Sequence, residues 1–377
     1  MRFSGLALLT MACATGPASS LPQTGSSQNQ QSTETVRIGV FSLFKPKELV
    51  LRAVRGSDLI VDIDGHSQTV SQESSPIHLY ASGGQIEMRS RNLRFQGVSL
   101  RAHRAGPSGT PSASFVLEVP GKLRRLYSGT LEIQAHGQIL EAVVTMPVET
   151  AVASIVAAES PPGEGIEALK AQAVAARSFL IARQAAHADF DFCDTTHCQF
   201  LRSPPAEKEP AAKAARATAG LVLTWHDDGV VQEQVLAAMY ARSCGGRTRT
   251  LREIGIVSRG YPYYKVHCVY CSHHPEAWRR DAAIAAGSDA ASKPRSSPAT
   301  ERDRLAFNRI HGWGAIPSLG NGIAGDDGKR SIVGRGDGHG LGLCQLGAAD
   351  MARQGADFAR ILAHYYPNTR LTQMPRP

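Results

Sequence analysis

Short runs of apolar and polar residues follow one another from about residue 36 onward, a pattern typical of β-strands. Turn-forming pairs such as Asp64-Gly65 and Pro120-Gly121 separate these runs. We expect strands at Val36–Phe41, Leu49–Val54, Leu59–Ile63, Gln85–Met88, Ser114–Val119, Tyr127–Ile133 and Ile139–Val144. Within them no pair of acids, bases or metal ligands stands out, so this part is predicted to be a scaffold or one wall of a groove.

The apolar period lengthens to that of a helix after Pro147. Val148, Val152 and Ile155 share one face, which predicts a helix over 147–158 that must end at Pro161-Pro162. Further helices are expected at about 165–186 and 357–366, and a strand-like run at 230–240. The predicted fold class is therefore α+β, with a β-rich N-terminal lobe followed by a mixed α/β lobe and a groove between them.

The N-terminus has a short basic start, an apolar stretch and then small residues, as export signals do. We expect a signal peptide at residues 1–20 and a flexible linker at 21–35, which is rich in Ser, Gln and Thr. Cys13 offers a site for lipid anchoring. No later apolar run approaches the roughly 20 residues that span a bilayer, so no transmembrane segment is expected after the signal.

The 377 residues are 42% hydrophobic and 20% charged, enough to build a core and two lobes. The formal net charge is +8, but the basic residues are scattered and only 6% of residues are aromatic. This composition argues against a nucleic-acid-binding surface.

Glu159 lies at the C-terminal end of the first predicted helix, where the helix dipole disfavours a carboxylate. A helix C-terminus and a partly apolar setting both favour the neutral acid, so Glu159 is a candidate general acid. The alternative is an exposed glutamate in a fraying helix end.

Two cations, Lys170 and Arg177, are seven residues apart on one face of the second predicted helix. Near Glu159 they could bind an anionic or carbonyl-bearing ligand. The alternative is ordinary solvated helix charge.

Cys193, His197 and Cys198 bring two thiols and one imidazole close together in sequence, as in sites that hold zinc. Three protein ligands leave a fourth position open, so the spacing does not separate a structural site from a catalytic one. A short-loop disulfide, or two free thiols beside an incidental histidine, is the alternative, since exported proteins favour disulfides.

Four more cysteines follow, and they make six after the signal peptide, an even number that permits complete pairing. They are Cys244, Cys268, Cys271 and Cys344. A second metal site made of four thiolates and a pair of disulfides both fit this pattern.

The glycine-dense stretch 334–348 contains a single histidine, His339, and also Gln345. Its glycines would let both side chains project into a groove. It is no phosphate-binding loop, because no Gly-Lys-Ser/Thr follows. A tight turn with a hydrogen-bonded histidine is the alternative.

Several motifs, taken together and in order, resemble the SpoIID/LytB family, the stage II sporulation protein D or amidase-enhancer domain. They are Glu159 with the Glu-Ala-Leu-Lys-Ala-Gln helix 167–178, Cys193–Gln199, Tyr240–Gly246, Gly336–Ala348 and His364–Pro367. The resemblance extends over about 36–369, with a β-rich lobe at 36–144, a SpoIID-type catalytic lobe at 145–369 and a variable insertion at 281–304. The family's usual Met-Ser-Gln is replaced by Leu343-Cys344-Gln345.

The resemblance implies an extracytoplasmic protein that acts on peptidoglycan, as a lytic transglycosylase of glycan strands without stem peptides. It matches Glu159 to the catalytic acid, and Cys193, His197 and Cys198 to a structural zinc site. It also implies that Lys170, Arg177, Tyr240 and Ser243 line the substrate site, to which the glycine stretch would add His339 and Gln345.

Two other functions stay open at this level. The protein could be a non-catalytic wall-binding enhancer of a partner cell-wall amidase. It could also be a zinc hydrolase that uses metal-bound water, although no glutamate or histidine adjoins the Cys/His cluster in a familiar hydrolase spacing.

Overall fold

The computed structural model describes residues 34–91, 93–106, 112–161, 163–183, 187–195, 198–226, 233–257, 260–281, 300–312, 314–319, 322–326 and 329–374. The predicted signal peptide 1–20, Cys13, nearly all of the linker 21–35, His197 and most of the insertion 281–304 lie outside the described residues.

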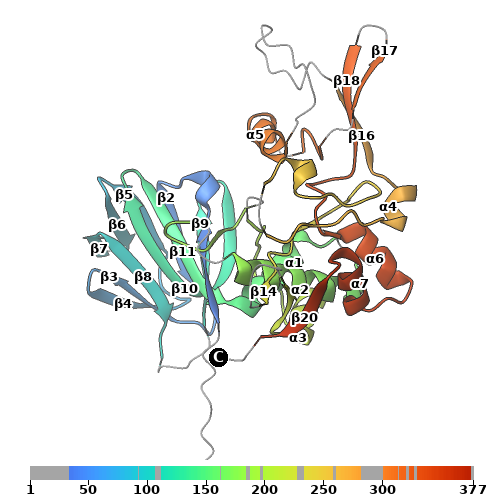
Figure 1. The fold of residues 1–377 in the computed structure, drawn as a ribbon. Helices are drawn as coiled ribbons and strands as arrows, with labels where there is room; N and C mark the ends of the chain where they lie inside the picture. The colour runs from blue at the N-terminus through green and yellow to red at the C-terminus, as the bar shows by residue number, and fades with distance from the viewer. Residues whose placement is uncertain are drawn as a thin grey trace, which may run out of the picture. The chain divides into compact units, whose positions relative to one another are not determined.

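A large, mostly antiparallel sheet is built from the first half of the described chain (Figure 1). Its strands are β1 (Thr35–Val40), β2 (Glu48–Ala53), β3 (Leu59–Ile63), β4 (His66–Val70), β5 (Ile77–Ser82), β6 (Gln85–Ser90), β7 (Leu93–Gly97), β8 (Ser99–Arg104), β9 (Ala113–Val119), β10 (Leu123–His136), β11 (Ile139–Pro147) and β12 (Phe192–Cys193). They run in the order β12-β1-β11-β10-β9-β2-β5-β6-β7, and β8, β3 and β4 branch from β10. All seven predicted strands are present.

Strand β10 is the longest in this sheet and changes partners along its length. Its first half pairs with β9 as far as Gly129, and its second half pairs with β11 from Thr130 onward. Gly129 has a φ of 152°, and a Cβ there would collide with the carbonyl oxygen of Thr145. Glycine therefore allows the close backbone approach at which the strand passes from one partner to the next.

Five strands of this sheet, β4, β5, β7, β8 and the two-residue β12, were not predicted. β4 is a polar example, since only Val70 of His66–Val70 is buried. Hydrogen bonds and side-chain contacts with neighbouring strands stabilise such a strand, because its own residues bury little apolar surface.

Three helices pack together beside the sheet: α1 (Val148–Glu159), α2 (Ile166–Ala182) and α3 (Pro210–Ala217). Buried Val152 and Leu180 of these helices belong to the same hydrophobic cluster as Leu131 and Val144 of the sheet. Both predicted helices are confirmed, and α1 ends at Glu159, as the two following prolines require.

The other face of α2 packs against a second hydrophobic cluster, which the C-terminal half supplies. Its elements are β13 (Leu221–Trp225), β14 (Gln234–Val235), β15 (Tyr240–Ala241), α4 (Val269–His273), β16 (Ala277–Asp281), α5 (Glu301–His311), β17 (Gly322–Asp326), β18 (Lys329–Arg335), β19 (Leu343–Cys344), α6 (Gln345–Arg353), α7 (Phe358–Tyr365) and β20 (Thr369–Gln373). The sheets here are small: β14-β13-β20, the parallel pair β15-β19, and β16-β18-β17.

Two predictions for this half need correction. Of the described residues in the run 230–240, only those in β14 and at Tyr240 are strand, because the intervening residues bond locally, as Ala238 N–H does to the Leu236 carbonyl. The insertion 281–304 ends inside helix α5, which Thr300 and Asp303 cap reciprocally.

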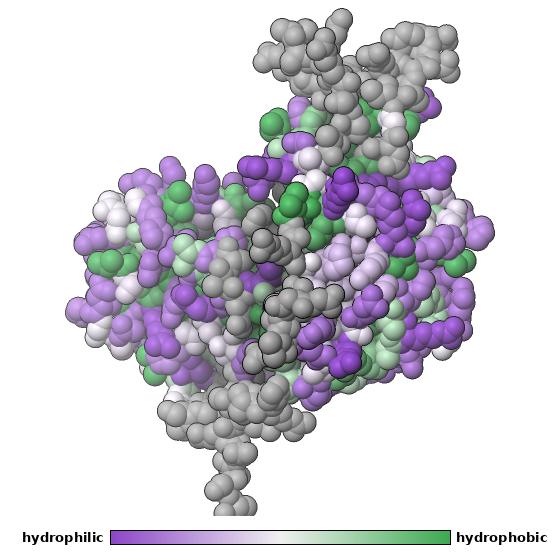
Figure 2. Space-filling view, viewed as in Figure 1, coloured by the Kyte–Doolittle hydropathy of each residue, from purple (hydrophilic) through white to green (hydrophobic). Residues whose placement is uncertain are grey.

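Residues 32–377 form one compact unit, so the division into two lobes with a groove between them stays a prediction. None of the described helices is both long enough and apolar enough to cross a bilayer. On the face shown in Figure 2, hydrophilic side chains predominate and hydrophobic ones are scattered.

Among the described residues Arg177 is the largest fully buried side chain, and it joins three helices. Its guanidinium makes two hydrogen bonds to the Glu149 carboxylate of α1, at 2.8 and 2.6 Å. It also donates to the carbonyls of Ala215 at the end of α3 and Leu221 at the start of β13. This network ties α1 and α3 to α2.

We expect Arg177→Met to lower the free energy of unfolding by about 3 kcal/mol, because it leaves Glu149 and two carbonyls without their donor. The matched control is Lys170→Met on the same helix, whose cation pairs with Glu167 at a partly exposed site and should lose less than about 1 kcal/mol. Urea unfolding of both variants measures the difference. Equal stability of the two variants would contradict this role of Arg177.

Candidate functional site

A cleft of about 500 Å³ surrounds the C-terminal end of α1. It is lined by Ala158, Glu159, Phe179, Cys198, Gln199, Phe200, Ala238, Met239, Tyr240, Ala241, Arg242, Ile254, Ile256, Glu301, Arg304, Leu305, Asn308, Gly314, Pro317, Asp337, Gly338, His339 and Gln345. Apolar and polar side chains together line this cleft, as they do in sites that bind sugars or other partly polar ligands.

The Glu159 carboxyl lies in this cleft and accepts a hydrogen bond of 2.5 Å from the Phe200 N–H. Burial raises its pKa to about 7, and the Tyr240 hydroxyl and the Phe200 amide only partly oppose this rise. The carboxyl therefore holds a proton near neutral pH far more often than an ordinary glutamate does. This agrees with the neutral acid expected from the helix-end position.

Several buried polar atoms near Glu159 have no regular hydrogen bond within the described residues. They are the Tyr240 hydroxyl, the Gln172 Nε2 and the Gln199 Oε1. Tyr240 and Gln199 line the cleft itself. Buried polar groups are rarely left without partners, so these atoms are suited to meet polar groups of a ligand or water.

The backbone around Glu159 is held from two sides. Gln345 Nε2 donates to the Glu159 carbonyl at 3.0 Å, and Ser160 Oγ donates to Gln172 Oε1 at 2.8 Å. The parallel pairing of Tyr240 with Leu343 places Tyr240 and Gln345 on adjacent chain segments. The acid is thus positioned by residues that lie far from it in the sequence.

His339 also lines the cleft, as predicted for a side chain projecting from the glycine stretch. Burial lowers its pKa to about 4, and its Nδ1 accepts a hydrogen bond of 3.0 Å from the Leu341 N–H. The imidazole is therefore neutral at physiological pH, with its proton on Nε2, and serves as a hydrogen-bond donor.

The far wall of the cleft comes from α5 and the loop that follows it. Arg304 and Glu301 form a buried ion pair at 2.5 Å, and Arg304 also donates to the carbonyls of Ile316 and Pro317. Arg242 and Asp337 lie opposite each other at 3.8 Å across a more exposed part of the lining. Glu301 and Asp337, the other two carboxylates among the lining residues, thus each lie beside an arginine.

A thiol-imidazole cluster lies directly beside the cleft. His187 Nε2 is 3.2 Å from Cys198 Sγ, and the Sγ atoms of Cys193 and Cys198 are 3.4 Å apart. The three ligand atoms lie within 4.8 Å of one another, a donor set of nitrogen and sulfur that fits Zn²⁺. The predicted ligand His197 lies outside the described residues, and His187 is a ligand candidate that the sequence analysis did not name.

The cluster is connected to the sheet by a buried ion pair. Arg125 of β10 lies 2.9 Å from the Asp194 carboxylate, which also accepts from the Phe41 N–H at 3.3 Å. Burial raises the Asp194 pKa to about 6, and Arg125 opposes the rise. This pair fixes the segment between Cys193 and the cleft.

Comparison with known proteins identifies the region that contains these residues. Residues 136–225 match the family model described as stage II sporulation protein, SpoIID. This segment of the chain is similar to the SpoIID family. The match covers Glu159, helix α2 and the Cys/His cluster, and it confirms the resemblance drawn from the motifs.

Relatives extend the likeness beyond this segment. An uncharacterized protein from Brachyspira hyodysenteriae is 27% identical over an alignment of 270 residues, and this alignment covers 64% of this chain and 70% of that protein. The stage II sporulation protein D of Bacillus subtilis is 24% identical over 314 residues, 74% of this chain and 87% of its own length. That of Bacillus amyloliquefaciens is 24% identical over 316 residues, covering 74% and 90%.

Three residues that the resemblance placed at the substrate site are not among those that line the cleft. Arg177 is buried in the network with Glu149, and Lys170 donates to Glu167 at 2.7 Å. Ser243 is buried with its Oγ 3.5 Å from Cys271 Sγ. Tyr240, His339 and Gln345 do line it. The positions of Lys170 and Arg177 on one helix face did not show that each has a carboxylate partner, so the sequence could not tell that they lie away from the cleft.

Sequence reasoning missed Phe200, whose amide contacts Glu159, together with the wall formed by α5. Phe200 follows the Cys/His cluster, so the proximity of that cluster to Glu159 was the available signal. Helix α5 lay at the edge of a stretch interpreted as an insertion, although its Thr300-x-x-Asp303 capping pattern marks a helix start.

We expect Glu159→Gln to stabilise the protein relative to wild type as the pH rises. Because burial raises the carboxyl pKa from 4.5 to about 7, its favourable contribution is complete below about pH 4.5 and is lost as the pH rises through 7. The amide of the Glu159→Gln variant does not ionise, so its contribution to stability does not change with pH. The free energy of unfolding of the variant should therefore exceed that of wild type by on the order of 2 kcal/mol at high pH. Urea unfolding of both proteins across this range measures it. A pH-independent difference would contradict the raised pKa.

Proposed function

We propose that this protein is an exported lytic transglycosylase that cuts peptidoglycan glycan strands lacking stem peptides. The observation that carries the proposal is the buried Glu159 carboxyl at the wall of the cleft, whose pKa burial raises to about 7. Glu301 and Asp337 each pair with an arginine, which leaves Glu159 as the lining carboxyl, among the described residues, available to exchange a proton. One such carboxyl fits intramolecular ring closure better than the paired carboxylates of ordinary glycosidases.

In the proposed mechanism the Glu159 carboxyl gives its proton to the glycosidic oxygen, and the bond from that oxygen to the muramyl C1 breaks. Oxocarbenium charge develops on the sugar ring. The Glu159 carboxylate then takes the proton from the 6-hydroxyl of the same sugar while that oxygen bonds to C1. A 1,6-anhydro ring forms, the acid is regenerated and water takes no part.

Residues around Glu159 would orient the glycan. The Gln199 Oε1 supplies acceptor capacity for an N-acetyl group, and the Tyr240 hydroxyl lies close enough to Glu159 to contact the same sugar. Ile254, Ile256 and Leu305 offer apolar surface for sugar faces. Arg242, whose side chain is 54% exposed, can meet the lactyl carboxylate.

Zinc is the proposed cofactor of the His187, Cys193 and Cys198 cluster. Bound there, it supplies structural cross-linking rather than a reactive centre. The same segment continues through Gln199 to Phe200, so fixing the cluster fixes the amide that contacts Glu159.

Glu159→Gln should lower formation of 1,6-anhydro-muramyl ends from purified stem-free glycan by about 10²- to 10⁴-fold. Mass spectrometry of the products measures it. Glu164→Gln is the matched control, because burial also raises the Glu164 pKa to about 7 but that residue does not line the cleft. The control should keep wild-type activity, and unchanged anhydro-product from Glu159→Gln would refute the role of Glu159.

Because the acid must be protonated, the wild-type kcat/KM should fall about tenfold for each pH unit above about 7. If the wild-type protein binds glycan but forms no anhydro-product at any pH, the enzyme proposal fails. The outcome would then favour the non-catalytic alternative, an enhancer of a partner cell-wall amidase, which predicts glycan or amidase binding that survives Glu159→Gln.

His187→Ala should lower the zinc content of the purified chain by about one ion, because it removes one of the three neighbouring ligand atoms. His78→Ala is the control, since its partner is Glu48 on the sheet. Elemental analysis of both variants measures the content. Equal zinc in both would exclude His187 as a ligand.

A further inference from the structure

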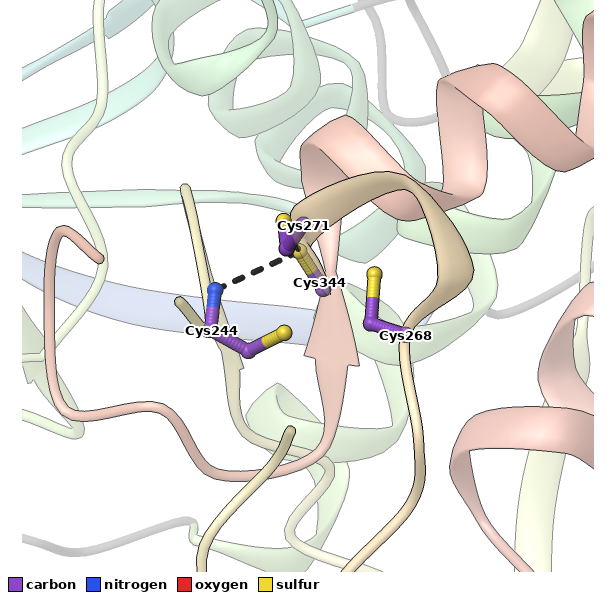
Figure 3. Close-up of side chains that lie close together, drawn as sticks. All are labelled: Cys244, Cys268, Cys271 and Cys344. Carbon is purple, nitrogen blue, oxygen red and sulfur yellow. Dashed lines mark hydrogen bonds between the residues drawn. The ribbon is translucent and has the colours of Figure 1, made fainter. Parts of the chain in front are cut away.

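Four cysteines from three separate stretches of the C-terminal half meet in one place (Figure 3). Cys244 follows β15, Cys268 and Cys271 lie at the start of α4, and Cys344 ends β19 just before α6. All four are at least 93% buried, within the second hydrophobic cluster. This cluster is separate from the His187, Cys193 and Cys198 set.

The four sulfurs converge on one point. Every Sγ lies within 4.8 Å of each of the other three, and those of Cys271 and Cys344 are 3.5 Å apart. In a tetrahedral site with Zn–S bonds of about 2.3 Å, neighbouring sulfurs are separated by about 3.8 Å. Two disulfides would require sulfurs to approach only in pairs, at about 2.05 Å. A four-way convergence is what a single tetrahedral ion needs.

The surroundings donate hydrogen bonds to sulfur. The Cys244 N–H donates to Cys344 Sγ at 3.4 Å, drawn as the dashed line in Figure 3. The Tyr365 hydroxyl donates to Cys268 Sγ, also at 3.4 Å. Donors aimed at sulfur stabilise thiolates, which are the form that binds metal. Buried thiolates without a cation would be costly, so the arrangement suits a bound divalent ion.

The backbone is shaped to bring these sulfurs together. Gly245 and Gly246 have φ values of 71° and 120°, which let the chain turn sharply after Cys244. A Cβ on Gly347 would lie 2.5 Å from Cys268 Sγ and would also collide with the Tyr365 hydroxyl. The spacing Cys268-x-x-Cys271 is that of a zinc knuckle.

We propose that Cys244, Cys268, Cys271 and Cys344 form a structural tetrathiolate Zn²⁺ site. The site ties β15 to β19, the two strands whose pairing places Tyr240 and Gln345 beside Glu159. Three residues separate Tyr240 from Cys244, and Cys344 directly precedes Gln345. The ion therefore supports the cleft without contacting a ligand in it.

The first experiment measures zinc per chain in the full-length protein, purified without chelator. Cys271→Ala should lose about one zinc ion relative to wild type. Ser272→Ala, the next residue on α4, is the matched control and should lose none, because its hydroxyl bonds only to neighbours in α4. Iron in place of zinc, or unchanged zinc in Cys271→Ala, would overturn the proposal.

The second experiment uses the wild-type chain, so it does not depend on whether a variant folds. The protein is denatured in the presence of an alkylating reagent and a chelator, without reductant. Mass spectrometry of its peptides then shows which cysteines are alkylated. A tetrathiolate site predicts alkylation of all four cysteines. Alkylation that requires prior reduction would show disulfides and overturn the proposal. Neither readout involves glycan cleavage, so both are independent of the proposed enzyme activity.

Discussion

The C-terminal end of α1 is the point on which the rest of the site depends, because it places a carboxyl group where solvation is poor and the helix dipole is unfavourable. Two prolines force the helix to end there, so the position of Glu159 is fixed by covalent geometry rather than by a flexible loop. Burial raises the carboxyl pKa to about 7, while the Phe200 amide and Tyr240 prevent a larger rise. The same acid can therefore hold and release a proton near neutral pH.

The groups around that carboxyl come from distant parts of the chain, and each is held by packing that has nothing to do with the acid itself. Gln345 and Tyr240 depend on a two-residue parallel strand pair, which backbone hydrogen bonds alone would hold weakly. Phe200 depends on the segment after Cys198, which the buried Arg125–Asp194 pair joins to the sheet. Each support adjoins a cluster of soft ligand atoms: the four cysteines beside the strand pair, and His187, Cys193 and Cys198 ahead of Phe200.

Arg177 shows how a charged residue can belong to the fold rather than to the site. In sequence it looks like Lys170, a cation on the same helix face. In the structure Glu149 and two carbonyl groups surround it, and burial makes those contacts obligatory. Ser243 is a similar case, since its hydroxyl faces a cysteine sulfur instead of the cleft.

The sequence by itself determined the strands with strong alternation, the end of α1 at paired prolines, the misplaced carboxyl of Glu159 and the family motifs, because each depends on neighbours within a few residues. It did not reveal the short strands β4, β5, β7, β8 and β12, which pair with neighbouring strands of the large sheet. Nor did it separate Arg177 from the cleft, find His187, or decide that four cysteines from three stretches meet at one point. Those outcomes depend on contacts between residues far apart in the chain, and only the tertiary structure brings them together.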